Sequence, residues 1–209
     1  MDNLAYNYAA DDYATEEFNN EPDYELIGGV KFYMAAAAPF VNHISIIISL
    51  AGIFGNYIKK KGIKAIPLSE ADVYLSKKQH FRPDFCILCD LSKISTGGER
   101  IYGAPDLVVE VLSKSTMDND LGPKKAAYEE YGVKEYWIID PWSKRIEVFH
   151  LVDGKFVFKG SYMEYSEEDY DYDQIPPTID KIQVSIFDDL IVDVHEIFEW
   201  YINTPVKEK

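Results

Sequence analysis

The chain has 209 residues, of which 47% are hydrophobic and 27% are charged. This length corresponds to roughly one domain, and the composition excludes a wholly disordered chain and a fibrous repeat. The formal charge of -15 argues against a protein that attracts nucleic acid through a general excess of Lys and Arg.

The acidic charge is concentrated in two segments. Residues 1–30 carry eight carboxylates and residues 163–180 carry seven, and neither segment contains Lys or Arg. The remaining 21 acidic and 21 basic residues balance. We therefore predict a flexible acidic tail over residues 1–22 and a single domain over residues 23–209, with an acidic loop at 163–180. A nucleic-acid role would have to come from local geometry in the neutral body.

The first predicted elements are a hairpin and a long apolar helix. Alternating residues on both sides of a Gly-Gly turn predict the hairpin over residues 24–34. The helix is expected from about residue 41 to residue 57, with Asn42 as its N-cap. Because its apolar residues occupy more than one face, and polar residues interrupt them, we expect it to be buried in the protein and not in a membrane.

Strands and helices are predicted to alternate through the rest of the chain. Asp120 is the expected cap of a helix that has Pro123 in its first turn and ends at Gly132. A strand–helix–strand unit with a helix of about 12 residues implies a right-handed crossover between parallel strands. The predicted elements are strands 71–75, 83–89, 107–113, 136–140, 145–151, 155–159 and 183–187, a helix between 120 and 132, and a C-terminal helix at 195–201.

This order predicts the fold class α/β or α+β. Its core runs helix, three strands, helix, strand, and it forms a mixed sheet to which β-hairpins and a C-terminal helix are added. Strand 145–151 alternates polar and apolar residues, as an edge strand does, and it could pair with a second copy in a homodimer.

The two cysteines are expected to be reduced core residues. Cys86 and Cys89 lie three apart in a predicted strand, so their thiols point to opposite faces and cannot form a disulfide or share a metal. No basic segment precedes an apolar run at the N-terminus, so no secretory signal is expected. These observations favour a cytoplasmic protein.

Two carboxylates could meet on the central strands. The strand around Glu110 is apolar on both faces, so an unpaired carboxylate there would cost several kcal/mol. Asp84 begins the preceding strand, and the two side chains converge if the strands are neighbours. Because two such carboxylates repel each other, a divalent cation would relieve them, and Mg²⁺ prefers few protein carboxylates and several waters.

This arrangement resembles the PD-(D/E)XK nuclease fold and, more closely, the Uma-type restriction endonucleases of bacteria. The resemblance covers residues 23 to 200. The segments that carry it are Glu25-Leu-Ile-Gly-Gly29, His43, Arg82-Pro-Asp84, Pro105-Asp-Leu-Val-Val-Glu-Val-Leu-Ser113, Asp120-Leu-Gly-Pro-Lys124, Tyr128 and Gly132-Val-Lys-Glu-Tyr-Trp-Ile-Ile-Asp-Pro141.

The resemblance implies that Asp84 and Glu110 bind Mg²⁺ or Mn²⁺, with the backbone carbonyl of Val111 as a further ligand. The lysine that orients the attacking water in this fold stands two residues after the acid, where this chain has Leu112. The resemblance then implies Lys124, at the start of the following helix. A lysine there opposes the helix dipole, which nearby carboxylates would explain.

Alternatives remain for each of these residues. Lys114 shares a strand face with Glu110 and is a rival to Lys124, and a site without a catalytic lysine is also considered. Asp106 is interpreted as a turn residue, with a metal-supporting role as the alternative. His43 is interpreted as a core histidine that could instead point into the site. The helix that carries His43 has no Asp or Glu, which argues against a second metal.

Three classes of function are considered, and one of them is a structural or interaction protein whose acidic segments recruit a partner. The preferred one is a Mg²⁺-dependent endodeoxyribonuclease, an enzyme that hydrolyses DNA phosphodiester bonds with a metal-activated water. The alternative is a nuclease-like module that binds nucleic acid or regulates a partner without turnover. The missing lysine at Leu112, the acidic flanks and the absence of a basic stripe favour that alternative.

Overall fold

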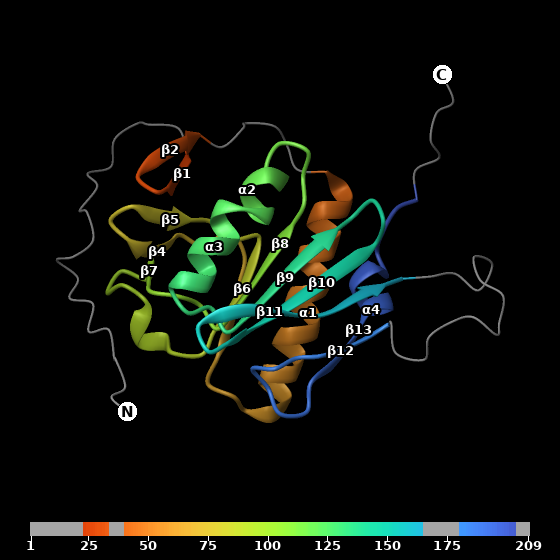
Figure 1. The fold of residues 1–209 in the computed structure, drawn as a ribbon. Helices are drawn as coiled ribbons and strands as arrows, with labels where there is room; N and C mark the ends of the chain where they lie inside the picture. The colour runs from red at the N-terminus through yellow and green to blue at the C-terminus, as the bar shows by residue number, and fades with distance from the viewer. Residues whose placement is uncertain (1–22, 34–39, 165–179, 204–209) are drawn as a thin grey trace, which may run out of the picture.

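The computed structural model describes residues 23–33, 40–164 and 180–203. The predicted tail over residues 1–22 lies outside these ranges, as does almost all of the predicted acidic loop. Within them the chain forms a six-stranded central sheet, a five-stranded second sheet, a two-stranded ribbon and four α-helices (Figure 1). The predicted mixed α/β class is therefore observed.

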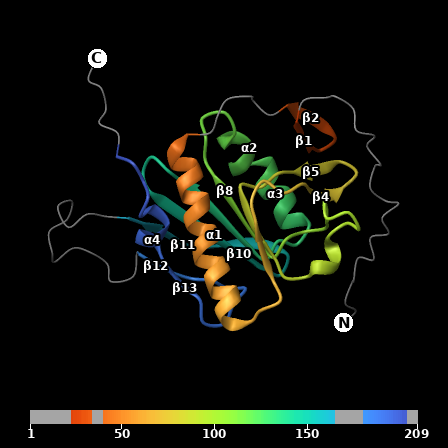
Figure 2. The same cartoon turned by 180° about the vertical axis from the view of Figure 1, so that it is seen from behind.

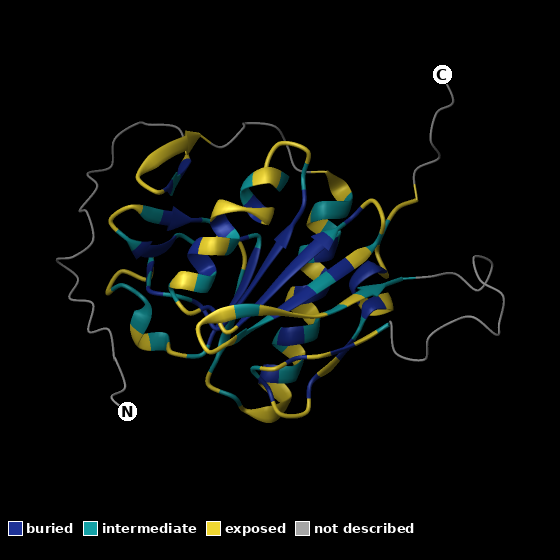
Figure 3. Cartoon of the chain, in the orientation of Figure 1, coloured by how far each residue is buried: buried dark blue, intermediate teal, exposed yellow. Residues whose placement is uncertain are grey.

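The central sheet has the strand order β11-β10-β9-β8-β6-β3. Strands β6 and β8 are antiparallel, whereas β8 and β9 are parallel, so the predicted crossover through a helix is confirmed. The strands are β3 (Ile66–Leu68), β6 (Phe85–Leu88), β8 (Leu107–Val111), β9 (Glu135–Asp140), β10 (Arg145–Val152) and β11 (Lys155–Met163). The inner strands β6, β8 and β9 are almost wholly buried, as Figure 3 shows, whereas the outer strand β11 is largely exposed.

The second sheet has the order β2-β1-β5-β4-β7 and contains the predicted N-terminal hairpin. Gly28 and Gly29 form its turn with φ of 61° and 85°, a conformation that glycine adopts without steric cost. The strands are β1 (Tyr24–Ile27), β2 (Val30–Tyr33), β4 (Val73–Ser76), β5 (Gln79–Phe81) and β7 (Ile101–Tyr102). The two-stranded ribbon consists of β12 (Lys181–Gln183) and β13 (Ile191–Asp193).

The helices cover opposite faces of the central sheet. Helix α1 (Val41–Lys61) crosses one face, beside the ribbon and α4 (Val194–Phe198), as Figure 2 shows. Helices α2 (Met117–Leu121) and α3 (Pro123–Glu130) lie on the other face, where the second sheet joins their core. A short 3-10 helix, η2 (Leu91–Lys93), follows β6.

Strand parity divides the side chains of the central strands between the two cores. Val109 and Val111 pack toward α1, whereas Val108 and Leu112 pack toward α3. Cys86 belongs to the α3 side and Cys89 packs against the α1 side, and both thiols are free. The prediction that the two thiols point apart is thus confirmed.

Several predictions about the strands were wrong. Residues 71–75 were expected in the central sheet, but β4 belongs to the second sheet, and β3 takes the edge position beside β6. A three-residue strand with Pro67 at its centre carries a weak strand signal, because proline is tolerated only at sheet edges. Strand β10 is not an edge strand, because it pairs with both β9 and β11, so the proposed dimer edge is covered.

The ends of the chain also differ from the prediction. The last predicted strand, 183–187, is shorter and earlier, since β12 ends at Gln183 and pairs with β13, which the sequence did not indicate. Helix α4 is only five residues long, and Asp193 caps it by accepting a hydrogen bond from the amide of His195.

Two predicted caps were also wrong. The N-cap position of α1 is Phe40, and Asn42 lies inside the first turn, where its side chain exchanges hydrogen bonds with the backbone of Ile202. Asp120 lies within α2 and not at the start of α3, whose first residue is Pro123. The side chain of Asn42 is thus bonded to a residue far away in the chain, and that of Asp120 pairs with Lys124 four residues on, instead of capping a helix.

Helix α1 is less buried than its composition suggested. Its inner face packs into the core through Ile46, Leu50 and Phe54, but Ile44 and Ile48 are 43% and 61% exposed. By length and composition alone α1 could cross a membrane, and 22% of that stretch is buried in the protein. The expectation that most of the helix is buried was therefore wrong, because only one of its faces meets the sheet.

The packing of α1 on the sheet generates a stability prediction. Phe54 is fully buried, with its ring centroid 5.5 Å from Phe85 and 5.9 Å from Trp137. Phe54→Ala should lower the free energy of unfolding by about 3–5 kcal/mol, because it leaves a cavity between helix and sheet. Urea denaturation measures the change. In the control Ile191→Ala, at a 59% exposed position, the change should stay within about 0.5 kcal/mol. Equal losses in both variants would contradict this packing.

Candidate functional site

The predicted pair of carboxylates lies at one end of the central sheet, where β6 begins and β8 ends. Phe85 pairs with Val109, so the next position along the ladder brings Asp84 opposite Glu110. The amide of Asp84 lies 3.4 Å from Glu110 Oε2, and the amide of Val111 donates to Asp84 Oδ2 at 2.7 Å. The structure therefore brings Asp84, Glu110 and the backbone of Val111 to one point.

Lys124 extends into this end of the sheet from the first turn of α3. Its side chain is almost fully buried, and Nζ lies 2.8 Å from Glu110 Oε1. The same ammonium lies 3.2 Å from Glu25 Oε1 on β1 and 3.2 Å from Asp120 Oδ1 on α2. One buried cation is thus shared by three carboxylates from three separate elements.

We call Glu25, Asp84, Glu110 and Asp120 the acidic cluster. Burial raises the pKa of Glu110 well above its ordinary value, although the charge of Lys124 opposes that rise. Burial also raises the pKa of Asp120. For Lys124, burial lowers the pKa, but the charges of Glu110, Glu25 and Asp120 outweigh it and raise the pKa well above its ordinary value. Lys124 is therefore held in its charged form.

Two buried tyrosines support the cluster from the α3 side of the sheet. The hydroxyl of Tyr128, one turn after Lys124, donates to Glu110 Oε1 at 2.8 Å. The hydroxyl of Tyr136 on β9 donates to the carbonyl oxygen of Asp120 at 3.0 Å. Burial raises the pKa of both phenols well above the ordinary value, so both remain neutral hydrogen-bond donors.

His43 reaches the cluster from the opposite layer. Its Nε2 lies 3.2 Å from Asp84 Oδ1, which links the first turn of α1 to the start of β6. Burial lowers the pKa of His43, but its hydrogen bond with Asp84 and the charge of that carboxylate outweigh burial and raise the pKa. The alternative in which His43 points into the site is therefore the one observed, because its imidazole contacts a candidate metal ligand.

The other two accessory candidates lie elsewhere. Lys114 follows β8 in an exposed turn, and its ammonium makes no ion pair within the described ranges. Asp106 precedes β8, at the end of the strand opposite to Glu110, and accepts hydrogen bonds from the Cys89 amide and from Lys134 Nζ, both at 2.7 Å. Asp106 thus has a structural role, because it binds the backbone at Cys89 and the side chain of Lys134. The structure does not place it near Glu110.

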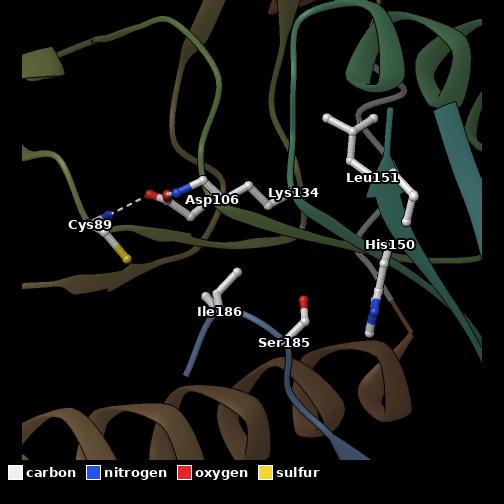
Figure 4. Close-up of a pocket in the computed structure, with 8 residues that line it drawn as sticks. Cys89, Asp106, Lys134, His150, Leu151, Ser185 and Ile186 are labelled. Carbon is white, nitrogen blue, oxygen red and sulfur yellow. Dashed lines mark hydrogen bonds and ion pairs between the residues drawn. The ribbon is translucent and has the colours of Figure 1, made fainter. Parts of the chain in front are cut away.

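A pocket of about 430 Å³ also lies at the Asp106 end of the sheet. Figure 4 shows Cys89, Asp106 and Lys134 on one side of it, His150 and Leu151 on another, and Ser185 and Ile186 on a lip above α1. Apart from Asp106, none of the predicted site residues lines this pocket. The candidate site is therefore the acidic cluster and not this cavity.

Glu25, Asp120 and Tyr128 belong to the segments that carry the family resemblance, but they were assigned no role in the site from the sequence. Asp120 stands four residues before Lys124, a spacing that places two residues on the same side of a helix, so this pair could have been recognised. Glu25 is 8% exposed on β1 and comes from a hairpin 85 positions before Glu110 in the chain. No local pattern connects it to the other residues, so only the folded chain reveals the contact.

The acidic cluster offers oxygen donors for a hard divalent cation. Asp84 and Glu110 are adjacent, and three carboxylates of the cluster, those of Glu25, Glu110 and Asp120, surround one buried ammonium. However, no three His, Cys, Asp or Glu side chains in the described ranges are placed so that they could hold a metal ion. The donor set therefore fits Mg²⁺ held by two carboxylates and completed by water, and not a closed protein cage.

The arrangement of sheets and helices is that of a known class of fold. A crystal structure titled as a putative nuclease belonging to DUF820, from Anabaena variabilis, matches with a TM-score of 0.64 at 18% sequence identity. The match covers 87% of this chain and 92% of that one. At this identity the likeness establishes the fold, which is a mixed α/β fold shared with that protein.

The family is established by the sequence. The model of the family described as "Uma2: Putative restriction endonuclease" matches residues 10–179, which is most of the chain. This protein therefore belongs to the Uma2 family, and the resemblance seen in its motifs is confirmed. A search of curated proteins found no match.

The buried ion pairs predict how stability depends on Lys124. Lys124→Met should lower the free energy of unfolding by roughly 3–5 kcal/mol at neutral pH, because it leaves buried carboxylates without a cation. A carboxyl group with a raised folded-state pKa favours the folded state at low pH, and this contribution is lost as pH rises through that pKa. Without Lys124 the pKa values of Glu110 and Asp120 rise further, so the variant should regain stability as pH falls.

Urea denaturation at about pH 7.5 and about pH 5 measures this dependence. The control is Lys155→Met, which removes an exposed ion pair with Glu129 and should change stability by less than about 1 kcal/mol at either pH. A Lys124→Met deficit that is as large at the lower pH as at the higher one would contradict the proposed electrostatics.

Proposed function

We propose that this protein is a Mg²⁺- or Mn²⁺-dependent endodeoxyribonuclease that hydrolyses phosphodiester bonds. The observation that carries this proposal is the meeting of Asp84, Glu110 and Lys124 at one end of the central sheet. Two adjacent carboxylates can hold a metal that activates water, and a cationic group can stabilise charge that develops on a phosphate. Membership in the Uma2 family supports the same class of reaction.

Asp84 and Glu110 would hold the metal, and the carbonyl of Val111 would be a further ligand. A bound Mg²⁺ lowers the pKa of a coordinated water and offsets the charge of a phosphate. The amide of Val111 already orients Asp84 by donating to Oδ2, which directs its other oxygen toward His43. Tyr128 similarly holds Glu110 through Oε1. Both carboxylates are therefore oriented before any ligand arrives.

Lys124 would orient the attacking water and stabilise negative charge on the phosphate. Its helix position replaces the strand position occupied here by Leu112, an apolar side chain that is 7% exposed in the core. Glu25 and Asp120 are the positioning residues of Lys124. A carboxylate oxygen of each lies 3.2 Å from Lys124 Nζ, one on β1 and the other on α2. The long side chain of Lys124 is thereby fixed, and the cost is the burial of three carboxylates, those of Glu25, Glu110 and Asp120.

His43 would act through Asp84. Its Nε2 contacts the oxygen of Asp84 that the Val111 amide leaves free, so the imidazole sets the orientation of that carboxylate. DNA is the proposed partner. The acidic segments at 1–30 and 163–180 would not bind its phosphates, because they carry negative charge themselves.

One observation favours a second candidate function, a nuclease-like module that binds nucleic acid or regulates a partner without turnover. Lys124 is already bonded to three carboxylates, so Glu110 would have to give up part of this network in order to hold a metal. In a module without turnover the same network would remain closed and serve stability alone.

Metal binding separates these functions from a purely structural cluster. Titration calorimetry with Mn²⁺ and with Mg²⁺ should give binding heat in the parent chain that is lost in Asp84→Asn and in Glu110→Gln. The control is Asp106→Asn, a carboxylate at the opposite end of β8, which should retain the heat. Binding that survives in both site variants, or that is absent from the parent with and without DNA, would reject the metal site.

Cleavage then separates the enzyme from the binding module. With Mg²⁺ or Mn²⁺ the parent should nick and linearise supercoiled plasmid DNA. Lys124→Met should lower the rate by roughly 10²–10³-fold, the range for the loss of one group that stabilises charge in the transition state. Because that variant loses a buried charge, Lys124→Arg is assayed beside it, and circular dichroism checks that both are folded. Metal binding by a folded parent that cleaves no DNA would favour the binding module.

A further inference from the structure

The outer face of α1 is an exposed apolar surface next to the candidate site. No Asp, Glu, Lys or Arg occurs between Val41 and Ile58, so the solvent side of this helix lacks the charges that such faces usually carry. Figure 2 shows that no labelled helix or strand lies over this face. The exposed fractions of Val41, Ile44 and Ile48 are 65%, 43% and 61%.

This surface continues beyond the helix at its N-terminal end. Phe40 is 69% exposed, and Asn42 holds the chain segment that follows α4 by two hydrogen bonds to Ile202. In that segment Trp200 is 67% exposed and Ile202 is 52% exposed. We call these apolar residues the α1 patch: Phe40, Val41, Ile44, Ile48, Trp200 and Ile202.

The area of the α1 patch is what one side of a protein interface supplies. Using roughly 60–120 Å² for a whole aliphatic side chain and roughly 200 Å² for an aromatic one, the exposed fractions give about 450 Å² of apolar surface. A standard interface contributes about 800 Å² per partner, of which roughly 56–65% is apolar. A patch of this size lies in the range of roughly 300–600 Å² that is typical of the largest apolar patch on a protein, and such patches are often functional.

The shape and charge of the α1 face fit a second copy of the same chain. At 100° per residue, Ile44, Ile48, Ala51, Gly52 and Gly55 lie on one side of the helix, with large residues in its first half and small ones in its second half. In an antiparallel pair centred on Ile48, each Ile44 would meet Gly52 of the other copy. This orientation also keeps the Lys59–Lys61 clusters at opposite ends, whereas a parallel pair would bring them together.

A membrane fits the same surface less well. The inner face of α1 is packed on the sheet through Ile46, Leu50 and Phe54, so the helix cannot insert without exposing that core. Helices that lie on membranes have a polar face rich in Lys and Arg, whereas the basic residues of α1 are confined to its last turn. A chain with a formal charge of -15 is also repelled by anionic lipid.

We propose that two copies of this chain associate through the α1 patch, with their α1 helices packed antiparallel around a two-fold axis near Ile48. This contact does not depend on the proposed nuclease activity. It does bear on the candidate site, because the same helix carries His43, which contacts Asp84. Association would therefore fix the helix that holds one of the two proposed metal ligands.

Sedimentation equilibrium of the full chain tests the proposal. The parent should sediment at twice the 24.0 kDa chain mass. Ile48→Lys should raise the dissociation constant at least about tenfold, because it places a charge at the centre of the contact. The matched control is Val157→Lys on the outer strand β11, at a 41% exposed position away from α1, which should leave the dimer unchanged.

Gly52→Leu distinguishes a close helix pair from a merely apolar surface. A Cβ at position 52 meets nothing within 4 Å in the chain, so this variant should fold normally. It adds apolar area but blocks the approach of Ile44 from the second copy, so it should also weaken the dimer. A general apolar partner or a membrane would instead bind this variant more tightly.

Three results would overturn the proposal. They are a monomeric parent chain, a dimer that persists in both Ile48→Lys and Gly52→Leu, and a dimer that is lost in Val157→Lys alone, which would place the contact on the β11 edge. Co-sedimentation of a monomeric parent with phosphatidylcholine vesicles, abolished by Ile48→Lys, would assign the α1 patch to a membrane instead.

Discussion

The structure depends on one buried charge pair, the ammonium of Lys124 and the carboxylate of Glu110. Glu110 is 2% exposed in a strand that is covered on both faces, and an uncompensated charge there would cost several kcal/mol. Lys124 on α3 balances this charge. Lys124 is in turn held by Asp120 on α2 and by Glu25 on β1. The second sheet, the helix pair and the central sheet must therefore assemble together for any of these charges to be tolerated.

The same constraint explains where the candidate site lies. The two apolar cores are separated by the central sheet, and polar groups can meet only at the ends of its strands. There His43 arrives from the α1 side and Lys124 from the α3 side, with Asp84 and Glu110 between them. Each of these buried charges would destabilise the protein without its partners, and the helices on both faces of the sheet supply them. Such a cluster is expected where the residues are kept for their chemistry.

Much of this arrangement could be predicted from particular residues. The convergence of Asp84 with Glu110 was expected if their strands were neighbours, as they are, and the crossover rule gave the parallel pairing of β8 with β9. Because Leu112 stands where the related nucleases have a lysine, the resemblance implied Lys124 instead, and the structure places Lys124 beside Glu110. The predicted caps failed, however, because Asn42 bonds to Ile202, which is far away in the chain, and because Asp120 lies in the separate helix α2, from which it pairs with Lys124.

The sequence by itself determined the features that depend on short-range regularities: the order of the main strands and helices, the family, and the two acids of the candidate pair. Only the tertiary structure decided which sheet β4 joins, that β10 is an interior strand, that Glu25 binds Lys124, and that one face of α1 remains exposed. These properties depend on contacts between segments far apart in the chain. Hydrophobic periodicity records that a face is apolar, but not whether another element covers it.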